Sequence, residues 1–278
     1  MSRDWGLVRD LRRAGRRRDL LILSLPTLVL LGIYQASDLV KQSLTLSHAM
    51  PSIIPAFTTH YVHYTQHHLT ANLLVYLLLA PVVYAFTVMA GRRQFFFVAF
   101  WTYVLVFPIV LSASSVVVFR EGQLFGFSGV ALTFAGFLPV AMTRYLGCRY
   151  SGPIDLDTAP SLFFLGTSIV AFLTVPNGRL RLSLVIASGI IGILYLWYPV
   201  RRLHQSRRGS FLEDTDRIGM IELVVFSIIA YYVILVVAFR TSMVGETSIV
   251  NLYLHFLGFS IGFLASYLTF RIDRKFES

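Results

Sequence analysis

The sequence predicts an all-α polytopic membrane protein with about eight spans and both termini in the cytoplasm. Of its 278 residues, 56% are hydrophobic and only 14% are charged, whereas about a quarter of a soluble domain is charged. The mean hydropathy is +0.69. The charged residues gather in clusters between long uncharged stretches, which excludes a disordered chain, a fibrous repeat and a water-soluble globule.

Eight uncharged apolar stretches approach the length of about 20 residues that crosses a bilayer as a helix. The fifth is the shortest. In chain order, the predicted spans are Leu20–Gln35, Leu69–Ala90, Phe95–Ala113, Phe127–Met142, Ser161–Val175, Leu182–Val200, Leu223–Phe239 and Val250–Phe270.

Arginine clusters set the orientation of these spans. Residues 1–19 form a basic leader that the positive-inside rule retains in the cytoplasm. Alternating from there, the pair Arg92 and Arg93 and the tail at 271–278 also fall inside, and residues 20–270 form one transmembrane domain. The basic residues behind the net charge of +10 therefore orient the spans in the membrane. They predict contact with a lipid bilayer rather than with nucleic acid.

Polar side chains at membrane depth mark candidate functional positions, because burying them in lipid is costly. They occur in a histidine-rich segment before the second span, in a Gly-Phe-Ser-Gly turn that opens the fourth, and near the start of the eighth. All three places are at the external ends of their spans, so we expect a serine, a histidine and an amide at similar depth. The residues are His63, His68 and Asn72, then Gly126, Ser128 and Gly129, then His255, Gly258 and Gly262.

Helix geometry predicts that two of these places meet. His255, Gly258 and Gly262 are spaced i, i+3 and i+7 and share one helix face, and Gly129 and Gly136 share a face near Ser128. Small residues stacked in this way let two membrane helices approach closely. Close approach is what a hydrogen bond between a serine and a histidine requires.

The three motifs, in this order, resemble those of the rhomboid intramembrane serine proteases. The resemblance rests on His63-x4-His68-x3-Asn72, Gly126-x-Ser128-Gly129 and His255-x2-Gly258-x3-Gly262, and extends to the turn at Gly91-Arg92-Arg93. It implies a six-helix core in the cell membrane. It also implies the activity: hydrolysis of transmembrane protein substrates near the external membrane face, without a cofactor.

The resemblance also implies roles for the residues. Ser128 would be the nucleophile and His255 the general base, a dyad with no carboxylate. The Asn72 amide, the His68 imidazole and the Ser128 backbone N–H would bind the oxyanion. The remaining motif residues, His63, Gly126, Gly129, Gly258 and Gly262, would support this site.

The chain departs from the family pattern in three ways. Leu132 stands where many members have a tyrosine that stacks on the histidine, so His255 would be held by packing alone. Three apolar stretches separate Ser128 from His255 instead of one, which predicts an extra transmembrane hairpin at 160–200. The first external loop also lacks the family's Trp-Arg pair. These departures leave an alternative open, a rhomboid-like pseudoprotease that binds membrane clients without cutting them.

The histidines before the second span allow two other readings. Four imidazoles within nine residues could bind zinc or copper, although no cysteine or carboxylate reinforces such a site. We predict no metal, and interpret His60 and His67 as solvated residues at the interface. A proton- or metal-linked transporter is the other reading, but its polar groups would lie near the midplane rather than at one face.

Overall fold

The computed structural model of the chain describes residues 6–149, 154–205, 219–240 and 246–277, which are almost entirely helical. The basic leader and the first apolar stretch form α1 (Gly6–Ala14) and α2 (Arg17–Tyr34). Short elements follow: α3 (Asp38–Leu44), β1 (Leu46–Ser47), α4 (Ile53–Thr58) and the 3₁₀ turn η1 (Thr59–Tyr61). This all-α architecture agrees with the predicted fold class.

The long helices begin with α5 (Gln66–Met89). The third span is built from α6 (Arg93–Trp101), a π-helical turn η2 (Thr102–Val106) and α7 (Phe107–Val118). After β2 (Gln123–Leu124) come α8 (Ser128–Arg149), the 3₁₀ turn η3 (Leu156–Thr158) and α9 (Ala159–Thr174). The remaining helices are α10 (Arg179–Gln205), α11 (Met220–Phe239) and α12 (Glu246–Glu277).

Seven stretches among the described residues are long and apolar enough to cross a membrane. They coincide with the second to eighth predicted spans, so the chain has the character of a multi-pass membrane protein. The predicted span Leu20–Gln35 is not among them, so the described residues contain seven candidate spans rather than the eight that the sequence predicts. Its helix, α2, opens on Arg17, Arg18 and Asp19, and the uncharged remainder is about 22 Å long, short of a 30 Å hydrocarbon core.

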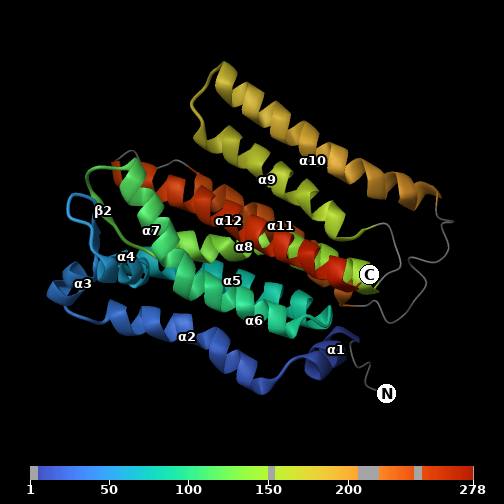
Figure 1. Ribbon diagram of the computed structural model, residues 1–278, viewed down its shortest axis with the longest axis horizontal. Helices are drawn as coiled ribbons and strands as arrows, with labels where there is room; N and C mark the ends of the chain where they lie inside the picture. The colour runs from blue at the N-terminus through green and yellow to red at the C-terminus, as the bar shows by residue number, and fades with distance from the viewer. Residues whose placement is uncertain (1–5, 150–153, 206–218, 241–245, 278) are drawn as a thin grey trace.

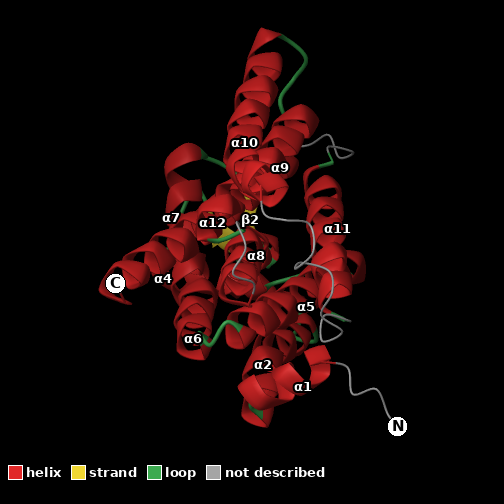
Figure 2. Ribbon diagram, turned by 90° about the vertical axis from the view of Figure 1, so that its right-hand side faces the viewer, coloured by secondary structure: helices red, strands yellow, loops and turns green. Residues whose placement is uncertain are grey.

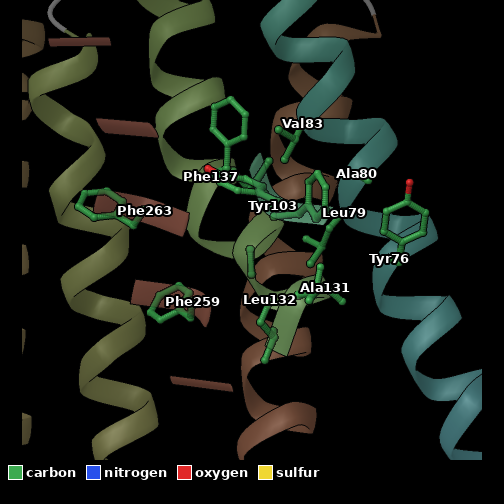
Figure 3. Packing of buried hydrophobic residues seen from close by; sticks show 14 of the residues in the cluster. Tyr76, Leu79, Ala80, Val83, Tyr103, Ala131, Leu132, Phe137, Phe259 and Phe263 are labelled. Carbon is green, nitrogen blue, oxygen red and sulfur yellow. The ribbon is translucent and has the colours of Figure 1, made fainter. Parts of the chain in front are cut away.

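Helix α8 occupies the centre of the molecule, with α5, α12 and α11 around it (Figure 1). Nearly all of its side chains are buried. Figure 3 shows the middle of this core, where Tyr76 and Leu79 of α5, Leu132 and Phe137 of α8 and Phe259 of α12 gather. Such an all-round apolar helix is what a central span requires.

Two peripheral units flank this core on opposite sides (Figures 1 and 2). On one side α2 runs beside α5. On the other, α9 and α10 form a hairpin in the region where the sequence predicts an additional one. Helix α9 touches the core, whereas most apolar side chains of α10 are exposed.

Helix α1 and the C-terminal end of α12 lie at the same end of the bundle (Figure 1). An ion pair of 3.3 Å between Asp10 of α1 and Arg149 fixes the leader beside the C-terminal end of α8. The N-terminal ends of α5, α8 and α12 therefore face the other way. The candidate residues belong to that opposite end, except Gly262, which lies midway along α12.

Candidate functional site

The closest packing in the candidate site is between α8 and α12. A Cβ atom at Gly258 would lie 2.9 Å from the carbonyl carbon of Gly129, and one at Gly262 would lie 2.6 Å from the Cα of Thr133. A Cβ atom at Gly136 would in turn meet the backbone of α12 at Phe263. The predicted close approach of these two helices is confirmed, and backbone meets backbone along it.

This seam places the two candidate catalytic residues on neighbouring helix turns. Ser128 is the first residue of α8, and its side chain is half-buried. Its neighbour Gly129 lies against Leu254, the residue before His255. Within the part of the chain that the structure describes, no hydrogen bond joins Ser128 to His255. Such bonds are often long in the absence of substrate and tighten when it binds.

His255 is held by more than packing, so the expectation drawn from Leu132 is wrong. Its Nδ1 lies 3.0 Å from the carbonyl oxygen of Ala238 in α11. The edge of the neighbouring Phe239 ring meets the imidazole, with centroids 5.9 Å apart and planes at 87°. A carbonyl oxygen can only accept, so Nδ1 carries the proton and Nε2 keeps its lone pair. That is the tautomer in which a histidine can take a proton at Nε2.

The turn before Ser128 lies against two potential oxyanion donors. Gly126 has φ +111°, a conformation that favours glycine. A Cβ atom there would lie 2.8 Å from Nε2 of His68 and 3.7 Å from Nδ2 of Asn72. The backbone leading into α8 thus reaches both side chains at a distance that any larger residue would prevent.

His63 fixes the orientation of Asn72. The Asn72 amide donates to Nε2 of His63 at 2.7 Å, and the backbone N–H of Phe127 approaches the same nitrogen at 3.4 Å. Burial lowers the pKa of His63 to about 3, so the ring is a neutral acceptor at neutral pH. One amide hydrogen of Asn72 remains for another partner. The structure therefore brings together His63, His68, Asn72 and the turn at Gly126.

Two other histidines differ from the expectation or were missed. His60 is buried rather than solvated, with Nε2 3.0 Å from the Ser112 hydroxyl of α7, and burial lowers its pKa to about 4. His48, which the sequence does not single out, is also buried and lies 2.6 Å from the Ser115 hydroxyl. Ser112 and Ser115 are spaced i, i+3 and share one face of α7, but this spacing alone does not indicate which histidines they meet. His67 is exposed, as expected.

The histidines of this region do not converge on one point. Among the described residues, no three His, Cys, Asp or Glu side chains are grouped as a metal ion would require. His60 faces Ser112, and His63 faces Asn72. His63 and His68 lie edge to face with ring centroids 4.8 Å apart, whereas His60 lies apart from them against α7.

Comparisons with known proteins place the chain in no group. No family model, curated protein or solved structure matches it.

Proposed function

We propose that the chain is an intramembrane serine endopeptidase of the rhomboid type. It would act in the cell membrane and cleave transmembrane protein substrates near the external face. Ser128 and His255 would form the catalytic dyad. The glycine-lined seam between α8 and α12 supports this proposal, because Gly129, next to Ser128, packs against Leu254, next to His255. The Nε2 of His255 can accept a proton, because Nδ1 donates to a carbonyl.

The proposed chemistry is acyl transfer in two steps. Nε2 of His255 takes the hydroxyl proton while Oγ of Ser128 attacks the scissile carbonyl, whose electron pair moves onto its oxygen. When the tetrahedral intermediate collapses, the C–N bond breaks and the imidazolium gives its proton to the leaving amine. Water, activated by the same imidazole, then releases the acyl group from Ser128.

The oxyanion would be bound by Asn72, His68 and the Ser128 backbone N–H. The approach of both side chains to Gly126 supports this role. Asn72 is oriented in advance by His63, which limits the reorganisation needed as charge develops. A single donor of this kind typically contributes about 2.7–4 kcal/mol to the stability of the transition state.

The substrate class follows from the membrane setting and from the family resemblance. A transmembrane helix keeps its carbonyls in internal hydrogen bonds, so cleavage favours a segment whose helix is locally unstable. The N-terminal ends of α5, α8 and α12, where the site lies, are one end of the bundle rather than its middle. We therefore expect cleavage near the end of a substrate helix.

One observation favours a second function. The described residues contain no hydrogen bond between Ser128 and His255. If the two stay apart when substrate binds, the protein would instead be a rhomboid-like pseudoprotease that binds membrane clients. The experiment below separates the two.

A covalent probe tests the dyad without knowledge of the natural substrate. Purified protein in detergent is treated with a fluorophosphonate, which reacts with activated serines. We expect wild type to be labelled, and both Ser128→Ala and His255→Ala to be unlabelled. Ser114→Ala is a matched control, since this serine bonds to Tyr253 in the same region yet lies outside the dyad.

The outcomes divide the two functions. Folded wild type that takes no label contradicts the peptidase and favours the pseudoprotease. Label retained in Ser128→Ala assigns the reactive serine elsewhere. For the oxyanion role, Asn72→Ala should slow labelling, and a change below about 1 kcal/mol in barrier contradicts that role.

A further inference from the structure

The C-terminal end of helix α11 lies beside His255. Its last residue is Phe239, and Arg240 is already in extended conformation. The last four carbonyl groups of a helix have no partner within it, so they accept from elsewhere. One of them, the carbonyl of Ala238, accepts from Nδ1 of His255 at 3.0 Å. The proposed catalytic base therefore supplies a hydrogen-bond donor to a carbonyl group that has no partner within its own helix.

We propose that the C-terminal end of α11, through the carbonyl of Ala238, is the positioning group for His255. It takes the place that a carboxylate holds in a three-residue serine-protease triad. This inference rests on the proposed function, and it adds a third member that the sequence cannot display. Every residue has a backbone carbonyl, so no side chain marks this role.

The first effect of the carbonyl is on orientation. In a triad, the carboxylate keeps the imidazole in the tautomer with the proton on Nδ1 and aims Nε2 at the serine. The Ala238 carbonyl accepts from the same nitrogen and imposes the same tautomer. The perpendicular ring of Phe239 limits rotation of the imidazole about this bond.

The second effect is electrostatic. The C-terminal end of a helix carries the equivalent of roughly half a negative charge and stabilises a nearby cation. His255 becomes a cation when it takes the serine proton, so the end of α11 stabilises the state that forms during reaction. A formal carboxylate is unnecessary there, and among the side chains that the structure describes none places one against this imidazole.

Methylation of one ring nitrogen tests the inference. The variant His255→Nδ-methylhistidine keeps the Nε2 lone pair and removes the donor to Ala238. We expect the rate of fluorophosphonate labelling to fall at least about tenfold, since a general base contributes about 10²–10⁴ and here loses only its alignment. The same replacement at the exposed His67 is the control, and should label at the wild-type rate.

A spectrum of the unmodified protein gives an independent readout. In ¹⁵N-histidine-labelled wild type, the ring signals that vanish in His255→Asn should show a protonated Nδ1 and an unprotonated Nε2. A proton on Nε2 in neutral His255 overturns the inference, whether or not the methylated variant folds.

The outcomes keep the two proposals separate. Unlabelled, folded wild type contradicts the proposed function. Labelled wild type, together with undiminished labelling of the methylated variant, leaves the dyad intact and overturns the role of Ala238.

Discussion

Two helix pairs in this protein are built from similar residues and packed in different ways. In the seam between α8 and α12, glycines let backbone touch backbone, and almost every residue of the α8 span is buried (89%). In the hairpin of α9 and α10, a Cβ atom at Gly189 would meet only a side chain, and only 11% of the α10 span is buried. The first pair can hold the two proposed catalytic residues in place, whereas the second leaves one helix face for lipid.

The glycines make the difference concrete. Gly258 faces the backbone of Gly129, which cannot move without shifting α8. In the hairpin, a Cβ atom at Gly189 would only touch the hydroxyl of Ser168 at 3.5 Å, an ordinary contact. Glycine content therefore does not distinguish a rigid seam from an adaptable one, but what faces each glycine does.

The largest expected effect comes from Gly258→Val. The added methyl groups would force α8 and α12 apart, at a cost of about 3 kcal/mol or more, because no side chain there can yield. Thermal unfolding in detergent and fluorophosphonate labelling would both report the change. We expect a marked drop in melting temperature and loss of labelling.

The matched control for this variant is Gly189→Ala in the hairpin. It should leave labelling unchanged and move the melting temperature little. If the two variants behaved alike, the contrast between the seam and the hairpin would be wrong.

A second prediction concerns the join between the hairpin and the core. Phe163 of α9 stacks on Phe259 and Phe263 of α12, with centroids 4.9 and 4.1 Å apart. Phe163→Ala removes this buried contact and should cost about 3 kcal/mol. Leu194→Ala in α10, where the side chain is 65% exposed, should cost under about 0.5 kcal/mol in the same unfolding assay. Equal losses would show that α10 is as integral as α9.

The sequence predicts most of this fold because the bilayer demands long apolar helices. All eight predicted spans fall on helices, and among the described residues seven of these helices are long and apolar enough to cross a membrane. The exception is α2. Its first three residues are charged, so the apolar part that remains is too short to cross the hydrocarbon core. The two-residue strands β1 and β2 were not predicted, because pairing so short has no periodicity to detect.

The sequence predicts those parts of the candidate site that depend on the identity of side chains. The spacing of glycines predicts the seam, and the structure has it. The anchor of His255 was not predictable, because it is a backbone carbonyl on another helix. The burial of His60 was missed as well, since a polar segment at a membrane interface gives no sign that a serine of α7 covers it.

A third prediction concerns α2, which is peripheral like α10 but is tied to the core by charge. The Asp19 carboxylate is fully buried and accepts from Nε of Arg93 at 2.8 Å and from the Tyr84 hydroxyl at 2.6 Å. Asp19→Asn leaves Arg93 without its partner and should cost about 2–3 kcal/mol, less than a fully buried pair because Arg93 is one-third exposed. Tyr84→Phe, which removes one neutral donor, should cost about 1 kcal/mol.

The same contact gives a pH dependence with a definite sign. Hydrogen bonding to Arg93 lowers the pKa of Asp19 to about 2, below the value of about 3.9 expected in an unfolded chain. The stabilisation is therefore present above about pH 4 and is lost as the pH falls toward 2. The difference in melting temperature between wild type and Asp19→Asn should narrow over that range. A constant difference would mean that the carboxylate charge is not what holds α2.

The smallest predicted effect lies within the hairpin itself. The Ser168 hydroxyl donates to the carbonyl of Val185 at 2.9 Å, linking α9 to α10. Ser168→Ala should cost about 0.6 kcal/mol, the average for such bonds between membrane helices. Labelling of Ser128 should stay at the wild-type rate, because the described part of α10 packs chiefly against α9 rather than against the seam. A fall in labelling with so small a loss of stability would mean that the hairpin adjusts the site, and the two regions would then act as one unit rather than as a rigid core with an attached helix pair.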